Sequence, residues 1–127
     1  MKCVLLIIMG FLLVVGCNNE DIDSSQVEEQ KMLDAIFIEI LDEAKSENCT
    51  NDENWSFTAI GSKACGGPAG FIIYSTTIDT VDFLNKVTGY TQAEAEFNQK
   101  WGIVSDCSTP QIPSAVICVN GTPELIY

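Results

Sequence analysis

The chain is short and strongly acidic: its 127 residues suffice for one small domain with a modest core. Asp and Glu together number 18 against 6 Lys and Arg, and the formal net charge of −12 excludes a nucleic-acid partner, because such a chain repels phosphate backbones. His is absent, which excludes Ser-His-Asp and Cys-His catalytic systems.

The first residues have the form of an export signal. Lys2 gives a positive start, and an apolar run from Val4 to Val15 follows, interrupted only by Gly10. A run of this length matches the apolar region of a signal peptide. It is too short for a transmembrane helix, which needs about 20 apolar residues.

The run ends at Val14 to Cys17 in the sequence Val-Val-Gly-Cys, which resembles the lipobox of bacterial lipoproteins. In that family the cysteine thiol receives diacylglycerol, and a peptidase cuts before the cysteine. The resemblance implies that 1–16 is a signal peptide and that Cys17 is the lipidation site. The residues that follow are polar and acidic with no apolar pattern, so we expect 17–26 to be a flexible, lipidated acidic tether. The resemblance also implies a lipid anchor in the bacterial cell envelope, at the outer membrane or the cell surface. An ordinary secretory signal with a chance cysteine is the alternative.

We expect the remaining chain, 27–127, to form a single α+β domain. A capping box of Ser25 and Glu28 predicts the start of a helix over about 26–46. Apolar residues at spacings of 3 and 4 define its buried face, with acidic residues turned away. We expect this apolar stripe to pack on the domain, and the alternative is a partner surface. The stripe contains Leu33, Ile36, Phe37, Ile40, Leu41 and Ala44.

Two strands should follow the helix. Residues 55–60 alternate between apolar and polar, as a half-buried strand does, and 71–76 forms a more continuously apolar strand. Between them, 61–70 is rich in glycine and predicts a loop.

A second helical region should begin at Asp79 or Thr80. Gly89 predicts either a break in one helix or the boundary between two short helices, the second capped by Thr91. Two terminal strands around Asn120-Gly121 complete the pattern, since this dipeptide is a strong hairpin signal. We therefore predict an antiparallel sheet of about four strands with helices on one face.

Four cysteines remain after the proposed lipidation site, and an even number in an exported chain predicts two disulfides. Their spacing lacks the close pairs of a zinc site and the Cys-x-x-Cys of a redox site, so we expect no metal and no cofactor. Three pairings are open. We favour Cys65–Cys107 with Cys49–Cys118, because this choice ties each long loop once.

The glycine-rich loop is the candidate binding site of the chain. It contains Ser62, Lys63, Gly66, Gly67 and Pro68, so a cation lies on a loop that a disulfide would brace. Such a loop is pre-organised for insertion into a partner's cleft, as in inhibitors of secreted proteases or lysozyme. The alternative is a purely structural loop whose glycines allow positive φ.

Trp55, the run from Gly61 to Pro68, Tyr74-Ser75 and Ser105 to Cys107 resemble a small disulfide-stapled domain of secreted or lipid-anchored bacterial proteins. That family has no established activity, so the resemblance implies a compact exported module and no catalytic residues. We therefore expect a membrane-anchored, non-enzymatic accessory or binding module, with an extracytoplasmic protein as its partner. The alternatives are the inhibitor described above and a structural or assembly lipoprotein whose acidic helix docks a basic partner.

Overall fold

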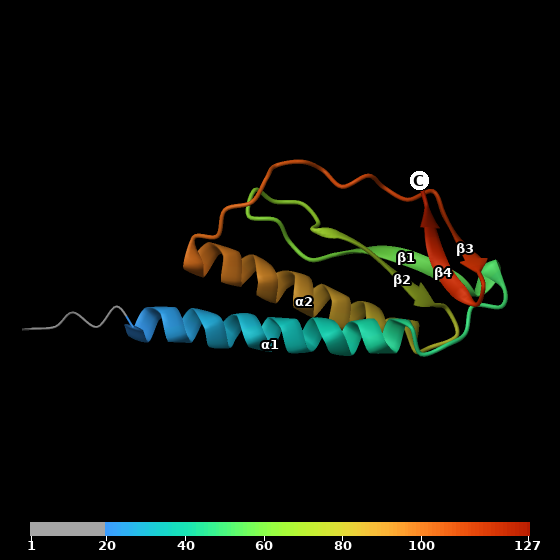
Figure 1. The fold of residues 1–127 in the computed structure, drawn as a ribbon, viewed down its shortest axis with the longest axis horizontal. Helices are drawn as coiled ribbons and strands as arrows, with labels where there is room; N and C mark the ends of the chain where they lie inside the picture. The colour runs from blue at the N-terminus through green and yellow to red at the C-terminus, as the bar shows by residue number, and fades with distance from the viewer. Residues whose placement is uncertain (1–19) are drawn as a thin grey trace, which may run out of the picture.

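The computed structural model describes residues 20–127 (Figure 1). The predicted signal peptide and the predicted lipidation site, Cys17, lie outside the described residues, as does the beginning of the predicted tether. No helix in the described part of the chain is long and apolar enough to cross a membrane. The elements are α1 (Glu20–Ala44), η1 (Asp52–Asn54), β1 (Trp55–Ile60), β2 (Gly70–Ser75), α2 (Thr80–Trp101), β3 (Ala115–Val119) and β4 (Thr122–Ile126).

The predicted α+β class is confirmed, with two helices, four strands and two disulfides. The strands pair antiparallel as β1–β2 and β3–β4, so they form two small sheets where the sequence predicted one. Figure 1 shows the two helices on one side of β1 and β2, with β3 and β4 near one end of this pair. The alternation in β1 identified a half-buried strand, but it could not specify which strands join edge to edge.

The β1–β2 pair separates two apolar clusters, because its strands carry apolar side chains on both faces. The face toward the helices contributes to the larger cluster, made of Ile40, Ala44, Ile60, Ile72, Tyr74, Phe83 and Val87. The opposite face packs against β3 and β4, and this smaller cluster is centred on Cys49, Trp55 and Val116. Two layers thus cover the sheet, one helical and one stranded.

Helix α1 begins at Glu20, earlier than predicted, so the flexible tether expected over 17–26 is helical from Glu20 onward. The predicted cap Ser25 lies inside the helix. The reason is composition, since 20–44 contains no Gly or Pro and many good helix formers. Glu29 fixes this end of α1 by accepting hydrogen bonds from Lys100 and from Trp101 Nε1 on α2.

Helix α2 is continuous through Gly89, so the predicted break is wrong. Its start is confirmed, because Asp79 Oδ1 accepts a hydrogen bond from Asp82 N at 3.0 Å. Thr91, expected as a second cap, instead donates to the Val87 carbonyl at 2.9 Å, a bond typical of a helix interior. A glycine costs a helix about 1 kcal/mol, and the burial of apolar side chains on both sides of Gly89 outweighs this cost.

Candidate functional site

The disulfide pairing predicted from the sequence is confirmed. Cys49 bonds to Cys118 with a Cα–Cα distance of 5.3 Å, and Cys65 bonds to Cys107 with one of 5.6 Å. The first bridge ties the segment after α1 to β3, in the smaller cluster. The second joins the β1–β2 loop to the segment after α2, and Figure 1 shows these two segments side by side at the same end of the molecule.

The β1–β2 loop ends in a tight turn. Lys63 N donates to the Gly67 carbonyl at 3.0 Å, and Gly66 N donates to the Lys63 carbonyl at 2.9 Å. Gly66 and Gly67 have φ of 92° and 82°, which glycine adopts without strain. The turn is exposed from Ala64 to Gly67, so the predicted loop presents a rigid backbone tip.

The Lys63 side chain points back into the protein. Its Nζ donates to Asp106 Oδ1 at 2.5 Å and to the Ser108 carbonyl at 2.7 Å, and the side chain is only 17% exposed. The hydrogen bond from Lys63 is the main reason that the pKa of Asp106 falls to about 2. The charge expected to contact a partner is therefore neutralised within the chain.

Helix α2 holds the base of the same loop. Gly61 N donates to Thr91 Oγ1 at 3.0 Å, and Ser62 N donates to Glu94 Oε2 at 2.6 Å. Asn98 Nδ2 donates to the Ser62 carbonyl at 2.7 Å. Position 61 requires glycine, because its φ is 77° and a Cβ there would lie 2.6 Å from Glu94 Oε2. Hydrogen bonds thus hold both the base of the loop and its tip, which fits a structural role.

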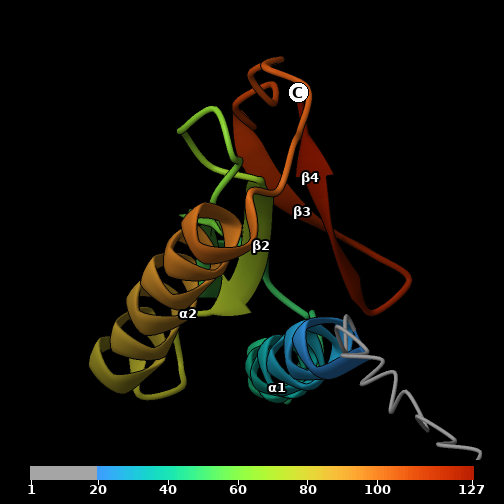
Figure 2. The same cartoon turned by 90° about the vertical axis from the view of Figure 1, so that its left-hand side faces the viewer.

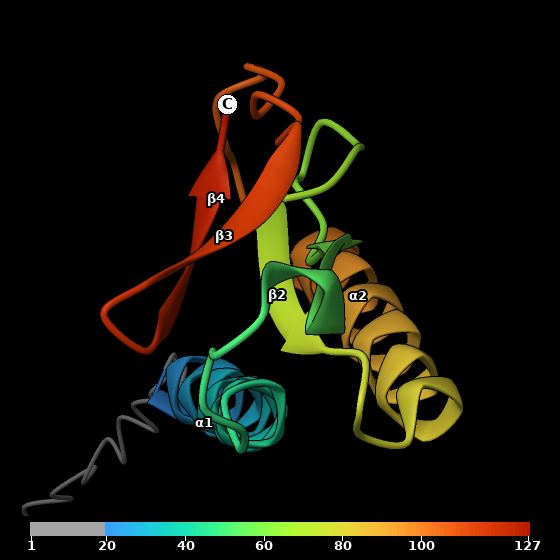
Figure 3. The same cartoon turned by 90° about the vertical axis from the view of Figure 1, so that its right-hand side faces the viewer.

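The β2 groove, which the sequence did not reveal, runs along the free edge of β2. It is a volume of about 480 Å³ between β2, the C-terminal end of α1 and the β3–β4 hairpin. Figure 3 shows α1, β2 and the β3–β4 hairpin facing one another on one side of the molecule. The groove is lined by Leu41, Lys45, Glu47, Asn48, Phe71, Ile72, Ile73, Gly121, Thr122, Pro123 and Leu125.

The strand edge in this groove has backbone groups without a partner strand. Thr76 N donates to the Asn54 carbonyl. With the register, this bond shows which facing residues of β1 and β2 are hydrogen-bonded to each other and which are not. In an antiparallel pair, alternate residues direct their N–H and C=O groups away from the partner. By this alternation, Phe71 and Ile73 direct theirs away from β1, and β2 pairs with no other strand among residues 20–127.

The edge of β4 differs, because a proline blocks it. Pro123 has no N–H, and its register partner Cys118 donates its own N–H to Asp52 Oδ1 at 2.7 Å. Proline on an edge strand discourages pairing with another chain. Of the two edges that border the groove, β4 is protected and β2 is open to pairing.

An aromatic pocket of about 300 Å³ adjoins the β2 groove, and both are lined by Phe71. Figure 2 shows the arrangement of α1, α2 and β2, which supply most of the lining residues. Burial raises the pKa of Tyr90 to about 12, and the neighbouring Glu94 adds to this shift. The aromatic pocket is lined by Phe37, Ile60, Gly61, Ala69, Gly70, Phe71, Tyr90 and Glu94.

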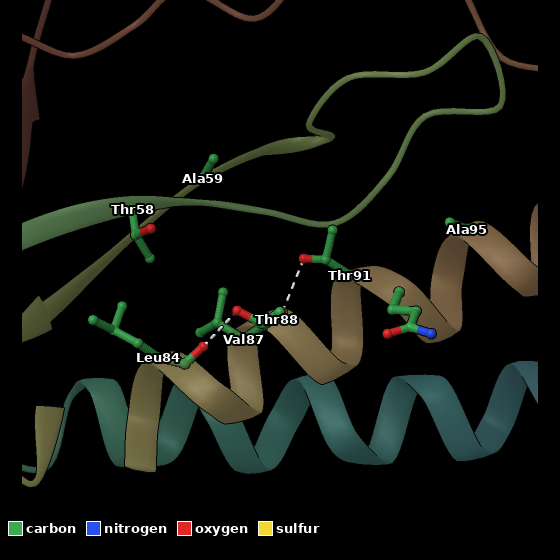
Figure 4. Close-up of a pocket in the computed structure, with 8 residues that line it drawn as sticks. Thr58, Ala59, Leu84, Val87, Thr88, Thr91 and Ala95 are labelled. Atoms are coloured by element: carbon green, nitrogen blue, oxygen red, sulfur yellow. Dashed lines mark hydrogen bonds between the residues drawn. The ribbon is translucent and has the colours of Figure 1, made fainter. Parts of the chain in front are cut away.

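A third, open depression of about 560 Å³ lies between β1 and α2 (Figure 4). Two of its three threonine hydroxyls are already engaged with the helix backbone. Thr88 donates to the Leu84 carbonyl and Thr91 to the Val87 carbonyl, each at 2.9 Å. No titratable side chain lines this depression. It therefore offers little chemistry for recognition.

Residues 20–127 bring together no group of three or more Cys, Asp or Glu side chains able to hold a metal ion. The chain has no match among protein-family models, curated proteins or solved structures. Its fold and site therefore define it as a small α+β domain with two disulfides and an open strand edge beside an apolar groove.

Proposed function

We propose that the chain is a lipid-anchored, non-enzymatic binding module of the bacterial envelope. It holds an extended segment of another extracytoplasmic protein in the β2 groove. The observation that carries the binding role is the free edge of β2, which lies in an apolar groove while the neighbouring β4 edge is blocked by Pro123.

Support for the anchor comes from the lipobox-like sequence at Val14 to Cys17 and from the two disulfides, which persist in oxidising compartments. Two or three acyl chains on one residue give stable membrane attachment. Since Cys17 precedes Glu20 by three residues, the lipid would lie within about 10 Å of the start of α1. A helix, in place of a flexible tether, would then hold the domain at the bilayer.

Detergent partition and mass spectrometry of the full-length chain test the anchor. Wild-type protein should enter the detergent phase with diacylglycerol on Cys17, and Cys17→Ala should lose both properties. Cys3→Ala is the control, because this cysteine belongs to the segment removed as signal, and it should leave lipidation unchanged. An unmodified Cys17 in the mature protein would refute the anchor.

Support for strand addition comes from the chemistry of the groove. An extended segment pairing with β2 would satisfy the outward backbone groups of Phe71 and Ile73. Its side chains would meet Leu41, Pro123 and Leu125. In this mode of recognition backbone hydrogen bonds supply affinity and side-chain pockets supply specificity.

Site-specific photocrosslinking in the producing bacterium tests the groove. A photoreactive residue at Thr122, which is exposed and lines the groove, should form a crosslink to one extended segment of a partner. The same residue at Val81, which is 71% exposed on α2 and outside the groove, is the matched control. Equal yields at the two positions would argue against a partner in the groove.

The acidic charge favours a basic partner over the inhibitor hypothesis. Twelve acidic residues lie within 18–53, around the α1 side of the groove, while the groove itself is lined by one acid, Glu47, and one cation, Lys45. Lys63, the cation on which an inhibitory loop would depend, is paired with Asp106. The role of an acidic helix in docking a basic partner thus becomes part of the same proposal.

A further inference from the structure

We propose that the aromatic pocket beside the β2 groove binds a lysine or arginine side chain of the partner's extended segment. This inference rests on the proposed function, and it specifies the chemistry of the partner. It depends on two aromatic side chains and one carboxylate that α1 and α2 bring to one pocket: Phe37, Tyr90 and Glu94.

The two aromatic walls, Phe37 and Tyr90, hold each other in place. The rings of Phe37 and Tyr90 have centroids 5.3 Å apart and planes tilted by 36°. Phe71 borders the pocket at the edge of β2, but its ring lies on the opposite face of the sheet, where it contacts Phe57 with centroids 6.0 Å apart. Phe37 and Tyr90 remain partly exposed, so a ligand can reach them. Such clusters attract cations through the negative faces of their rings.

Glu94 gives the pocket a fixed negative charge. Its Oε2 accepts from Ser62 N at 2.6 Å, and its Oε1 accepts from Tyr90 Oη at 3.2 Å. A carboxylate has about four acceptor sites, so these two bonds leave capacity for an ammonium or guanidinium group. No Lys or Arg lines the pocket, and Asp34 contributes to the negative environment of Tyr90.

Continuity with the groove favours a side chain over a free small cation. The pocket and the β2 groove share Phe71, and their α1 residues Phe37 and Leu41 are one helical turn apart. A segment that pairs with β2 therefore passes the mouth of the pocket. Its basic residue would enter the pocket while its apolar residues occupy the groove.

Small probes test the pocket without knowledge of the partner. Acetyl-lysine methylamide and its norleucine counterpart, which lacks the charge, are titrated into the full chain with both disulfides intact. Backbone NMR should show saturable, salt-sensitive shifts at Phe71 and Tyr90 with the lysine probe alone. Glu94→Gln should weaken that binding about fivefold or more, whereas Glu96→Gln, two residues farther along α2 and outside the pocket, should not.

A second variant keeps the test decisive if Glu94→Gln disturbs the loop that it supports. Phe37→Leu retains apolar volume and removes one ring, so it should also weaken the lysine probe about fivefold. Absence of lysine-specific shifts would overturn the inference, while crosslinking from Thr122 would still decide the proposed function. Shifts with tetramethylammonium but none with the lysine probe would also overturn it, because they would indicate a small quaternary ligand.

Discussion

At the scale of the residue, Lys63 shows how a single cation can be misjudged from sequence. Its place on a glycine-rich loop favoured contact with a partner, but its Nζ lies 2.5 Å from Asp106 Oδ1. The two residues are far apart in the chain, and the Cys65–Cys107 bridge between their loops brings them together. A sequence does not specify this proximity until the disulfide pairing is known.

The Lys63–Asp106 pair predicts a specific loss of stability in acid. The pKa of Asp106 falls from its usual 3.8 to about 2 in the folded protein, so its contribution to stability is present above pH 3.8. That contribution should disappear as the pH falls toward about 2. Unfolding of wild type and Asp106→Asn by denaturant across this range checks the sign: the difference in free energy should shrink as pH falls. A difference that grows would contradict the pairing.

At the scale of the element, local signals located the strands, the cap of α2 and the terminal turn. Asn120 and Gly121 have φ of 51° and 83°, as the predicted two-residue hairpin requires. The local sequence signals failed where tertiary packing determines whether a helix continues or ends. Gly89 suggested a break, yet Phe83, Val87 and Phe97 are buried along one continuous helix. The early start of α1 was missed because a plausible cap at Ser25 lies in a stretch that favours helix throughout.

Two glycines should respond oppositely to alanine. Gly89→Ala should raise the free energy of unfolding by about 0.5–1 kcal/mol, because the site is helical and a Cβ there meets nothing within 4 Å. Gly61→Ala should lower it, because its φ is 77° and the new Cβ would lie 2.8 Å from the Ala69 Cβ. Thermal unfolding of both variants is the measurement. Destabilisation by Gly89→Ala would mean that α2 is not continuous there.

At the scale of the whole molecule, the disulfides and the two small sheets determine the shape. Three pairings were open from the sequence, and the favoured one, which joins the two long irregular loops of Cys65 and Cys107, is the one found. The β2 groove could not be predicted, because its walls come from three distant segments represented by Leu41, Ile73 and Leu125. The continuous apolar run of β2 was the available signal, since it implied a strand covered on both faces. It did not reveal that one edge stays open.

The two disulfides should differ in how readily they are reduced. Cys65 and Cys107 are both exposed, whereas Cys49 is only 3% exposed. Mild reductant followed by alkylation and mass spectrometry should therefore label Cys65 and Cys107 first. By loop-closure entropy, loss of either bridge should cost about 4 kcal/mol, since the bridged residues are 69 and 42 positions apart. Earlier labelling of Cys49 would contradict the packing of the smaller cluster.

The central claim is that a partner pairs with the free edge of β2, and a matched pair of variants tests it most directly. Ile73→Pro removes the outward N–H without removing a bond to β1, and Ile73→Ala truncates the side chain but keeps that N–H. Crosslinking yield from Thr122 is measured in both backgrounds. The account predicts that Ile73→Ala keeps most of the yield and Ile73→Pro loses it, while both proteins remain folded. Equal yields in the two variants would contradict strand addition at β2.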